Sequence, residues 1–220
     1  MSAVYHVAHW PQTPRARLDW EHPAWSAVDP IELVHYMGDR PAHRPQVQVR
    51  LAYDDEAVHG IFRVADRYVR AVARQYQDSV CCDSCVEFFF TPGPACGHDY
   101  FNLEMNCGGT KLFRWNPAGA DFVPVAADDG EQVEVVSTLP RRVDPEIREP
   151  VTWTLAFRLP LAVVRRYAAT AAPPAPGVTW RANVYKCGDE TSHPHWLTWA
   201  KVEYPEPKFH LPAYFGTLTF

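Results

Sequence analysis

The heptapeptide YFNLEMN at residues 100–106 alternates apolar and polar side chains without interruption. Successive side chains of a β-strand point to opposite faces, so this stretch predicts a strand with two unlike faces. The apolar row is Phe101, Leu103 and Met105, and the polar row is Asn102, Glu104 and Asn106. Solvent alone rarely demands such a row of amides and carboxylates, whereas a ligand rich in hydroxyl groups does.

Two further stretches repeat this pattern. Residues 180–186, WRANVYK, place Arg181, Asn183 and Tyr185 on one face. Residues 85–91, CVEFFFT, separate two sets, which are Val86, Phe88 and Phe90 against Cys85, Glu87 and Phe89. If these strands are neighbours in one sheet, their polar rows form a shared binding face.

The rest of the chain predicts an all-β fold. Strand patterns recur at 4–7, 47–53, 58–64, 111–115, 132–139, 151–159, 195–200 and 216–220. Residues 161–169 favour a helix that the Pro-rich stretch 172–177 must end, and residues 66–77 fit either a helix or a loop. Short strands at close spacing predict an antiparallel β-sandwich, jelly-roll or immunoglobulin-like, with one or two short helices. We expect a single domain over residues 1–220, with 1–46 as an N-terminal wrapping segment.

Composition narrows the possible partners. The formal net charge of -5 argues against a nucleic-acid partner, which needs clustered Lys and Arg. No apolar run approaches the roughly 20 residues of a membrane span. Residues 1–10 lack the order of a secretory signal, which leaves either a cytoplasmic location or a signal that has been removed. The oligomeric state stays open.

The sequence has six cysteines, which are Cys81, Cys82, Cys85, Cys96, Cys107 and Cys187. Cys85 belongs to an apolar strand and is interpreted as a small buried hydrophobe. The Cys82-x-x-Cys85 spacing lacks a second close pair, so it signals a zinc site only weakly. Free thiols and disulfides both remain possible interpretations.

Four blocks follow one another along residues 20–220. The first two are Trp20-x-x-x-x-Trp25 with Val49-Arg50-Leu51-Ala52-Tyr53-Asp54-Asp55, and Asp83-Ser84-Cys85-Val86-Glu87-Phe88-Phe89. The third is the stretch 100–106, and the fourth is Trp180-Arg181-Ala182-Asn183-Val184-Tyr185 with Trp199 and Phe209-His210-x-Pro212-x-x-Phe215-Gly216. In this order they resemble the family 9 carbohydrate-binding modules and their family 9-like relatives.

The resemblance implies a non-catalytic β-sandwich that binds a mono- or oligosaccharide in proteins linked to polysaccharide breakdown. It also implies two tryptophans around the sugar, but the corresponding positions here are Val80-Cys81-Cys82 and Phe209. The family's ligand preference is therefore not carried over, and Glu87 is the polar contact that transfers. Structural calcium is implied as well, with Asp54, Asp55 and Asp66 as candidate ligands.

Sugar binding combines an aromatic face for the C–H side of a pyranose with polar groups for its hydroxyls. The predicted ligand-binding residues are Glu87, Asn102, Glu104, Asn106, Arg181, Asn183, Tyr185, Trp196, Phe209 and His210. Competing interpretations are a Glu87–Arg181 ion pair that fixes strand register, and turn hydrogen bonding by Asn102 and Asn106.

Two other functions stay open. Glu87 and Glu104 would serve a glycoside hydrolase if their carboxyls lay roughly 5–10 Å apart across a scissile bond. A metal- or haem-binding relative would use His193 and His195 for a transition metal, or Met105, His193, His195 and His210 for haem. Pro194 between the two histidines favours a loop rather than a metal-binding strand.

Overall fold

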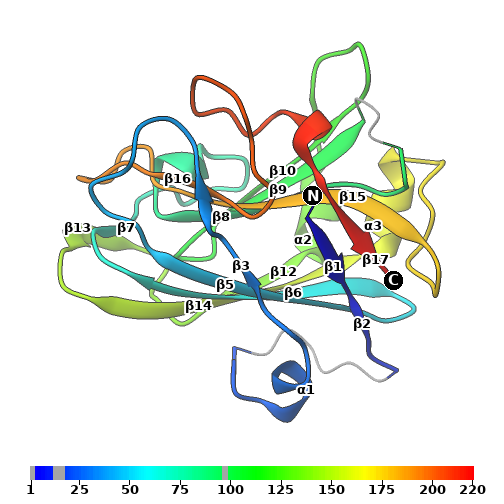
Figure 1. Ribbon diagram of the computed structural model, residues 1–220, viewed down its shortest axis with the longest axis horizontal. Helices are drawn as coiled ribbons and strands as arrows, with labels where there is room; N and C mark the ends of the chain where they lie inside the picture. The colour runs from blue at the N-terminus through cyan, green and yellow to red at the C-terminus, as the bar shows by residue number, and fades with distance from the viewer. Residues whose placement is uncertain (1–2, 12–17, 96–98) are drawn as a thin grey trace.

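The computed structural model describes residues 3–11, 18–95 and 99–220, and its strands form two sheets stacked face to face (Figure 1). The larger sheet has the order β1 (Val4–His6), β17 (Gly216–Thr219), β15 (Thr179–Cys187), β8 (Cys85–Thr91), β9 (Tyr100–Asn106), β10 (Lys111–Asn116) and β11 (Val123–Pro124). Two short strands extend it, since β16 (Trp196–Thr198) pairs with β15 and β4 (His35–Tyr36) pairs with β16.

The smaller sheet has the order β12 (Glu134–Ser137), β14 (Val151–Pro160), β6 (Ala57–Asp66), β5 (Gln46–Tyr53) and β2 (Ala8–His9). There β3 (Ile31–Glu32) also pairs with β5, while β7 (Val69–Ala71) and β13 (Val143–Ile147) form a separate ribbon. Among the strand pairs described, only β1–β17 and β2–β5 are parallel. The predicted β-sandwich is therefore confirmed, and β8 and β9 have the predicted bounds.

The main core lies between the two sheets. Phe88 of β8 and Leu103 of β9 face it from the larger sheet, and Phe157 of β14 faces it from the smaller one. On the other face, Cys85 and Phe89 of β8 and Tyr100 of β9 belong to a second apolar cluster, which lies outside the sandwich. The alternation in the sequence thus separates an inner face from an outer face.

The segment between β16 and β17 covers this outer face. It supplies Val202, Phe209 and Phe215 to the second cluster. In Figure 1 the segment, coloured orange to red, lies on the side of the larger sheet that faces away from the smaller sheet. Because this cover leaves part of the sheet open, it creates the hollow described below.

Helices are short and few in the part of the chain that the structure describes. They are α1 (Pro23–Ser26), α2 (Ala127–Gln132) and α3 (Leu161–Tyr167), with 3-10 turns at Val80–Cys82 and Pro212–Tyr214. α3 confirms the helix predicted at 161–169. Residues 66–77 were predicted as a helix or a loop, but they contain β7, because Val69 and Ala71 pair with Ile147 and Val143 of β13.

The N-terminal segment contributes edge strands to both sheets. Within it, β1 and β4 belong to the larger sheet, and β2 and β3 belong to the smaller one. Trp20 and Trp25 pack on Ala156 and Ile61, on the outer side of the smaller sheet. The segment therefore spans the edge of the sandwich and covers one face of it.

Candidate functional site

The central strands of the larger sheet bring two glutamates together. In the antiparallel β8–β9 pair, Glu87 is the direct register partner of Glu104. Tyr185 of β15 is the partner of Glu87 on the other side. Directly opposed residues have Cβ atoms about 4.5–5.5 Å apart, so the two carboxyls necessarily share their surroundings.

A pocket of about 260 Å³ opens over this pair. Its lining residues are Cys81, Glu87, Glu104, Cys187, Asp189, Trp196, Pro207, Lys208, Phe209 and His210. The sheet supplies the carboxyls and Cys187, while the covering segment supplies Pro207, Lys208, Phe209 and His210. Of the three residues expected to converge on one hollow, Glu87 and Glu104 line this pocket, whereas Arg181 does not.

Two aromatic side chains flank the carboxyls, and each is held in place. The Trp196 indole Nε1 donates a hydrogen bond to Asp189 Oδ1 at 2.8 Å. The Phe209 ring stacks on Tyr185 with centroids 4.1 Å apart, and the Tyr185 hydroxyl donates to the Phe209 carbonyl at 3.2 Å. Tyr185 is fully buried, so it supports the wall from behind rather than lining the pocket.

A chain of amides orients Glu104. Asn102 Nδ2 donates to Glu104 Oε1 at 2.7 Å, and Asn116 Nδ2 donates to Asn102 Oδ1 at 2.6 Å. Asn102 itself is fully buried. The structure therefore places Asn102 behind the Glu104 carboxyl, where it fixes the orientation of that group.

The carboxyls of the pocket resist ionisation. Burial raises the pKa of Glu87 well above its usual range, and the neighbouring Glu104 raises it further. Burial likewise raises the pKa of Glu104 to about 7, against the opposing hydrogen bond from Asn102. Burial also raises the pKa of Asp189. A protonated carboxyl both donates and accepts hydrogen bonds, which suits hydroxyl groups.

His210 forms part of the same pocket. Its Nδ1 lies 2.8 Å from the Tyr100 hydroxyl. Neighbouring side chains partly withdraw the His210 ring from water and lower its pKa to about 4, and the positive charges of Arg114 and Lys208 add to this effect. The imidazole is therefore neutral near pH 7 and supplies a hydrogen-bonding group without a charge.

Besides Asn102 and Tyr185, three further predicted residues do not line the pocket. The Arg181 guanidinium donates to Thr217 Oγ1 at 3.1 Å and to the Phe215 carbonyl, so it joins β15 to β17. Asn183 forms hydrogen bonds to both the N–H and the carbonyl of Ala200. Asn106 holds the turn after β9 by accepting from the N–H groups of Gly108 and Thr110.

The pocket also contains residues that the sequence analysis did not assign to it. Asp189, Lys208, Cys81, Cys187 and Pro207 all line it. Alternation along β15 places Cys187 on the face of Tyr185, which is a signal that the sequence does contain. The loop residues Asp189, Pro207 and Lys208 have no such periodic signal.

The candidate calcium ligands do not meet. Asp54 precedes β6 and accepts hydrogen bonds from the N–H groups of Glu56 and Ala57. Asp66 stands at the opposite end of β6, where His43 Nε2 lies 2.7 Å from its Oδ1. The two aspartates therefore belong to separate sites, and Asp55, next to Asp54, shares no site with Asp66. Calcium binding stays a prediction.

The candidate transition-metal ligands have other partners. His195 Nδ1 faces the His193 carbonyl at 2.9 Å, and its Nε2 faces Lys186 Nζ at 2.7 Å. The ring of His193 stacks on Tyr68 with centroids 3.6 Å apart. Neither nitrogen of His195 is left for a metal ion.

The haem candidates are also dispersed. Met105 lies in the core between the sheets, whereas His210 lines the pocket on the outer face. The structure therefore does not bring Met105 together with His210 as a ligand pair for haem. Cys96 and the two other residues of 96–98 lie outside the described residues.

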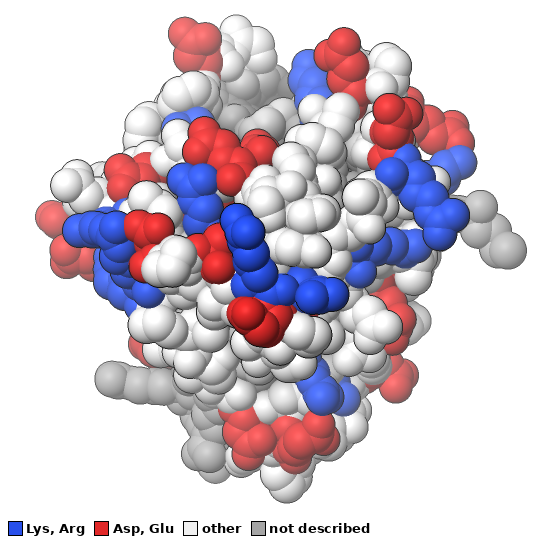
Figure 2. Space-filling model, turned by 90° about the vertical axis from the view of Figure 1, so that its left-hand side faces the viewer, with Lys and Arg blue, Asp and Glu red and all other residues white. Residues whose placement is uncertain are grey.

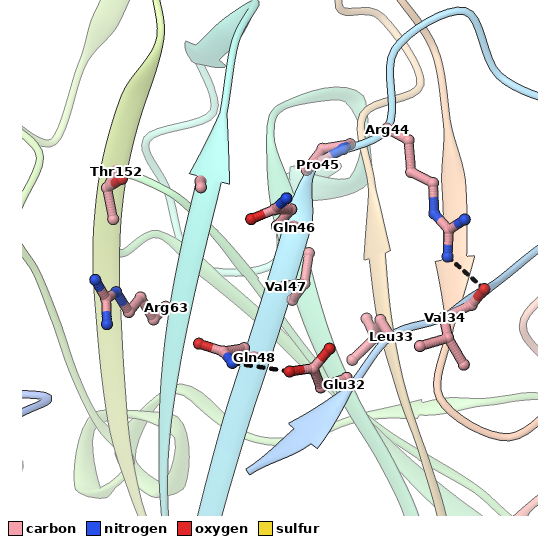
Figure 3. Close-up of a pocket in the computed structure, with 11 residues that line it drawn as sticks. Glu32, Leu33, Val34, Arg44, Pro45, Gln46, Val47, Gln48, Arg63 and Thr152 are labelled. Carbon is pink, nitrogen blue, oxygen red and sulfur yellow. Dashed lines mark hydrogen bonds between the residues drawn. The ribbon is translucent and has the colours of Figure 1, made fainter.

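A larger hollow of about 570 Å³ lies over β5 and β6 of the smaller sheet (Figure 3). Its lining includes Glu32, Gln46, Gln48 and Arg63, and Gln48 Nε2 donates to Glu32 Oε1 at 2.9 Å. None of its lining residues is aromatic. Since a pyranose needs an apolar face as well as polar groups, the smaller pocket is the better candidate.

Charged residues of both signs are intermixed on the end of the molecule shown in Figure 2. Arg70 and Glu190 form an ion pair of 3.3 Å, and Arg148 and Glu146 form one of 3.8 Å.

None of the helices in the described residues has the length and apolar composition that a membrane span requires.

The fold and the pocket together define a carbohydrate-binding β-sandwich, and comparison with known proteins specifies it. The sequence model of the family described as carbohydrate-binding family 9 matches residues 14–220. The chain therefore belongs to carbohydrate-binding family 9, and the predicted resemblance, sandwich fold and carbohydrate binding are confirmed at the level of the family. No curated protein matches the chain.

Solved structures share the architecture. A protein from Bacteroides uniformis, provisionally assigned as carbohydrate-binding, has 26% identity and a TM-score of 0.90, with 100% of both chains covered. A family 9 module from Caldicellulosiruptor kristjanssonii in complex with glucose has 11% identity and a TM-score of 0.67, covering 99% of this chain and 95% of that one. The same organism's module with cellotriose has 11% identity, a TM-score of 0.66 and coverages of 99% and 93%.

Proposed function

We propose that the pocket over Glu87 and Glu104 binds a monosaccharide or the terminal unit of an oligosaccharide. The observation that carries this proposal is the convergence of the two carboxyls with Trp196 and Phe209 in one open hollow. Trp196 and Phe209 cover the C–H face of the sugar, and the carboxyls bind its hydroxyls.

The size of the pocket supports one sugar unit. Its volume of about 260 Å³ falls below the roughly 300–1,000 Å³ that is usual for drug-sized ligands. Glucose and cellotriose in the structurally similar family 9 modules make glucose and short β-glucans the first ligands to test. The same proposal includes that this sugar binding is linked to polysaccharide breakdown.

Binding fits the two carboxyls better than hydrolysis does. A glycosidase pair needs one ionised and one protonated carboxyl, set apart by their environments. Here burial raises the pKa of Glu87 and raises that of Glu104 to about 7, so below pH 7 neither carboxyl is held in the ionised form. Incubation with aryl glycosides checks this point, and product formation that disappears in Glu87→Gln would favour the hydrolase.

Isothermal titration with glucose, xylose, cellobiose, cellotriose and borohydride-reduced cellotriose tests the proposal. We expect millimolar or tighter binding to at least one of these sugars. Glu104→Ala should weaken it by about 2 kcal/mol, or roughly thirtyfold. Gln46→Ala, in the larger hollow, is the matched control and should leave the affinity unchanged. Absence of heat with every sugar, from folded protein, would contradict the proposal.

A further inference from the structure

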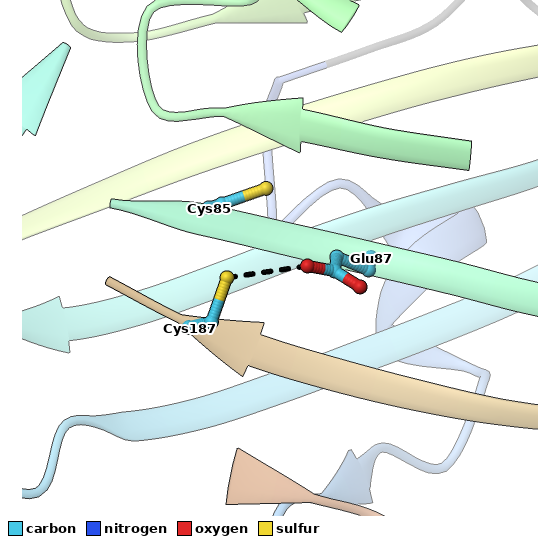
Figure 4. A group of neighbouring side chains, drawn as sticks. All are labelled: Cys85, Glu87 and Cys187. Carbon is cyan, nitrogen blue, oxygen red and sulfur yellow. Dashed lines mark hydrogen bonds between the residues drawn. The ribbon is translucent and has the colours of Figure 1, made fainter. Parts of the chain in front are cut away.

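At one end of the pocket floor, two thiols and a carboxyl lie side by side (Figure 4). Cys85 of β8 and Cys187 of β15 are direct register partners. Glu87 follows Cys85 by two positions, so its side chain lies on the same outer face. Cys187 Sγ lies 3.2 Å from Glu87 Oε1, and the three ligand atoms lie within 4.8 Å of one another.

These three residues stand out among possible metal ligands. In the part of the chain that the structure describes, they are the only group of three or more His, Cys, Asp or Glu residues with ligand atoms this close. All three are buried, and both cysteines are free. The cysteine pair in this group is therefore Cys85 and Cys187, which strand pairing brings together, and not the Cys82-x-x-Cys85 pair of the sequence.

From this geometry we propose that Cys85, Cys187 and Glu87 form a site for a thiophilic divalent cation of the Zn²⁺ class. Zinc binds thiolates at about 2.3 Å and carboxylate oxygens at about 2.0–2.2 Å. A tetrahedral arrangement then places the donor atoms about 3.6–3.8 Å apart. Side-chain movements of about 1 Å would bring the three donor atoms to these separations. Two soft sulfur ligands disfavour Ca²⁺ and Mg²⁺, which bind oxygen.

The site has three protein ligands and an open side. Cys187 and Glu87 line the pocket, so the fourth position faces the pocket and takes a water molecule. The inference does not require the pocket to bind sugar.

The experiment uses the full chain, reduced and freed of metal with a chelator, and titrated with Zn²⁺ against a chelating indicator. We expect one tight site per chain, weakened at least tenfold by Cys187→Ser and by Cys85→Ser. Cys82→Ser is the matched control, because Cys82 is a neighbouring free cysteine outside the group. It should bind Zn²⁺ like the parent protein.

X-ray absorption at the zinc edge identifies the donors directly. We expect two sulfur ligands with lighter ligands completing the sphere, and one fewer sulfur in Cys187→Ser. If a serine variant fails to fold, Glu87→Gln with Co²⁺ absorption provides the second test, and its spectrum should shift while retaining thiolate-to-cobalt charge transfer. No zinc binding by fully reduced protein, or binding unchanged in Cys187→Ser, would overturn the proposal. So would a sulfur count other than two.

Discussion

Glu87 and Glu104 are direct partners across the β8–β9 ladder, and both carboxyl groups line the same pocket. The ionisation of one carboxyl placed this way raises the pKa of the other, so the two groups titrate as a coupled pair. Strand register thus creates the polar floor of the pocket, and burial keeps its two glutamates protonated below about pH 7.

Replacement of Glu104 by glutamine should raise stability above pH 7 and leave it nearly unchanged near pH 4.5. Burial raises the pKa of Glu104 from 4.5 to about 7, so the folded state binds more protons than the unfolded state between these values. The free energy of unfolding therefore falls as pH rises through that window. Glu104→Gln should remove a fall of up to about 3 kcal/mol, measured by urea unfolding at both ends. Equal effects at the two pH values would disprove the shift.

Trp196→Ala should weaken sugar binding about tenfold, because the pocket loses an aromatic wall that contributes about 1–2 kcal/mol. Titration calorimetry with the best ligand of the panel measures the change. Tyr36→Ala is the control, since Tyr36 is an exposed aromatic residue of β4 that does not line the pocket. An equal loss in both variants would show a general effect on the fold.

Lys186→Met should destabilise the protein by about 3–5 kcal/mol, since it leaves a buried carboxylate without its cation. Lys186 Nζ lies 3.5 Å from Asp66 Oδ2, and both side chains are fully buried. Burial disfavours ionisation of Asp66, yet Lys186 and His43 hold its pKa at about 2.

The double variant Asp66→Asn, Lys186→Met should lose less than the single one. Urea unfolding compares them, with Lys201→Met of the exposed Lys201–Glu203 pair as control. That control should cost less than about 1 kcal/mol. Additive losses at Asp66 and Lys186 would argue against a coupled pair.

Gly60→Ala should destabilise the fold by about 1–3 kcal/mol through overpacking. Phe157 is the register partner of Gly60, and a Cβ on Gly60 would lie 2.2 Å from Phe157 Cε1. Gly93→Ala meets no atom within 4 Å and should be nearly neutral. Thermal unfolding measures both changes. The double variant Gly60→Ala, Phe157→Leu should lose less free energy of unfolding than the sum of the losses of the two single variants.

Much of the fold was predictable because strand alternation is a local property. Phe101, Leu103 and Met105 face the core, as their spacing predicts. The short strands β2, β3, β4, β7, β11 and β13 were missed, because two to five residues show too little periodicity. Their pairing depends on neighbours that are far away in sequence.

The site was predictable only in part for a related reason. Glu87, Glu104, Trp196, Phe209 and His210 meet in the pocket, as expected. Arg181 shares their sheet face, but a strand rises about 3.3 Å per residue, and Arg181 lies four positions from Tyr185. Its guanidinium therefore contacts β17 rather than the pocket. Alternation along a strand decides which face of the sheet a side chain occupies. Strand pairing decides which side chains on that face are neighbours.

The amino-acid sequence by itself determined which side chains point inward and which outward, because the two-residue period of a strand needs no partner. Only the tertiary structure decided which of the outward residues meet. Strand order and register placed Glu87 opposite Glu104 and Cys85 opposite Cys187. The covering segment then brought Phe209 and His210 over them. Such contacts between distant segments depend on the packing of the whole chain, and no local pattern encodes them.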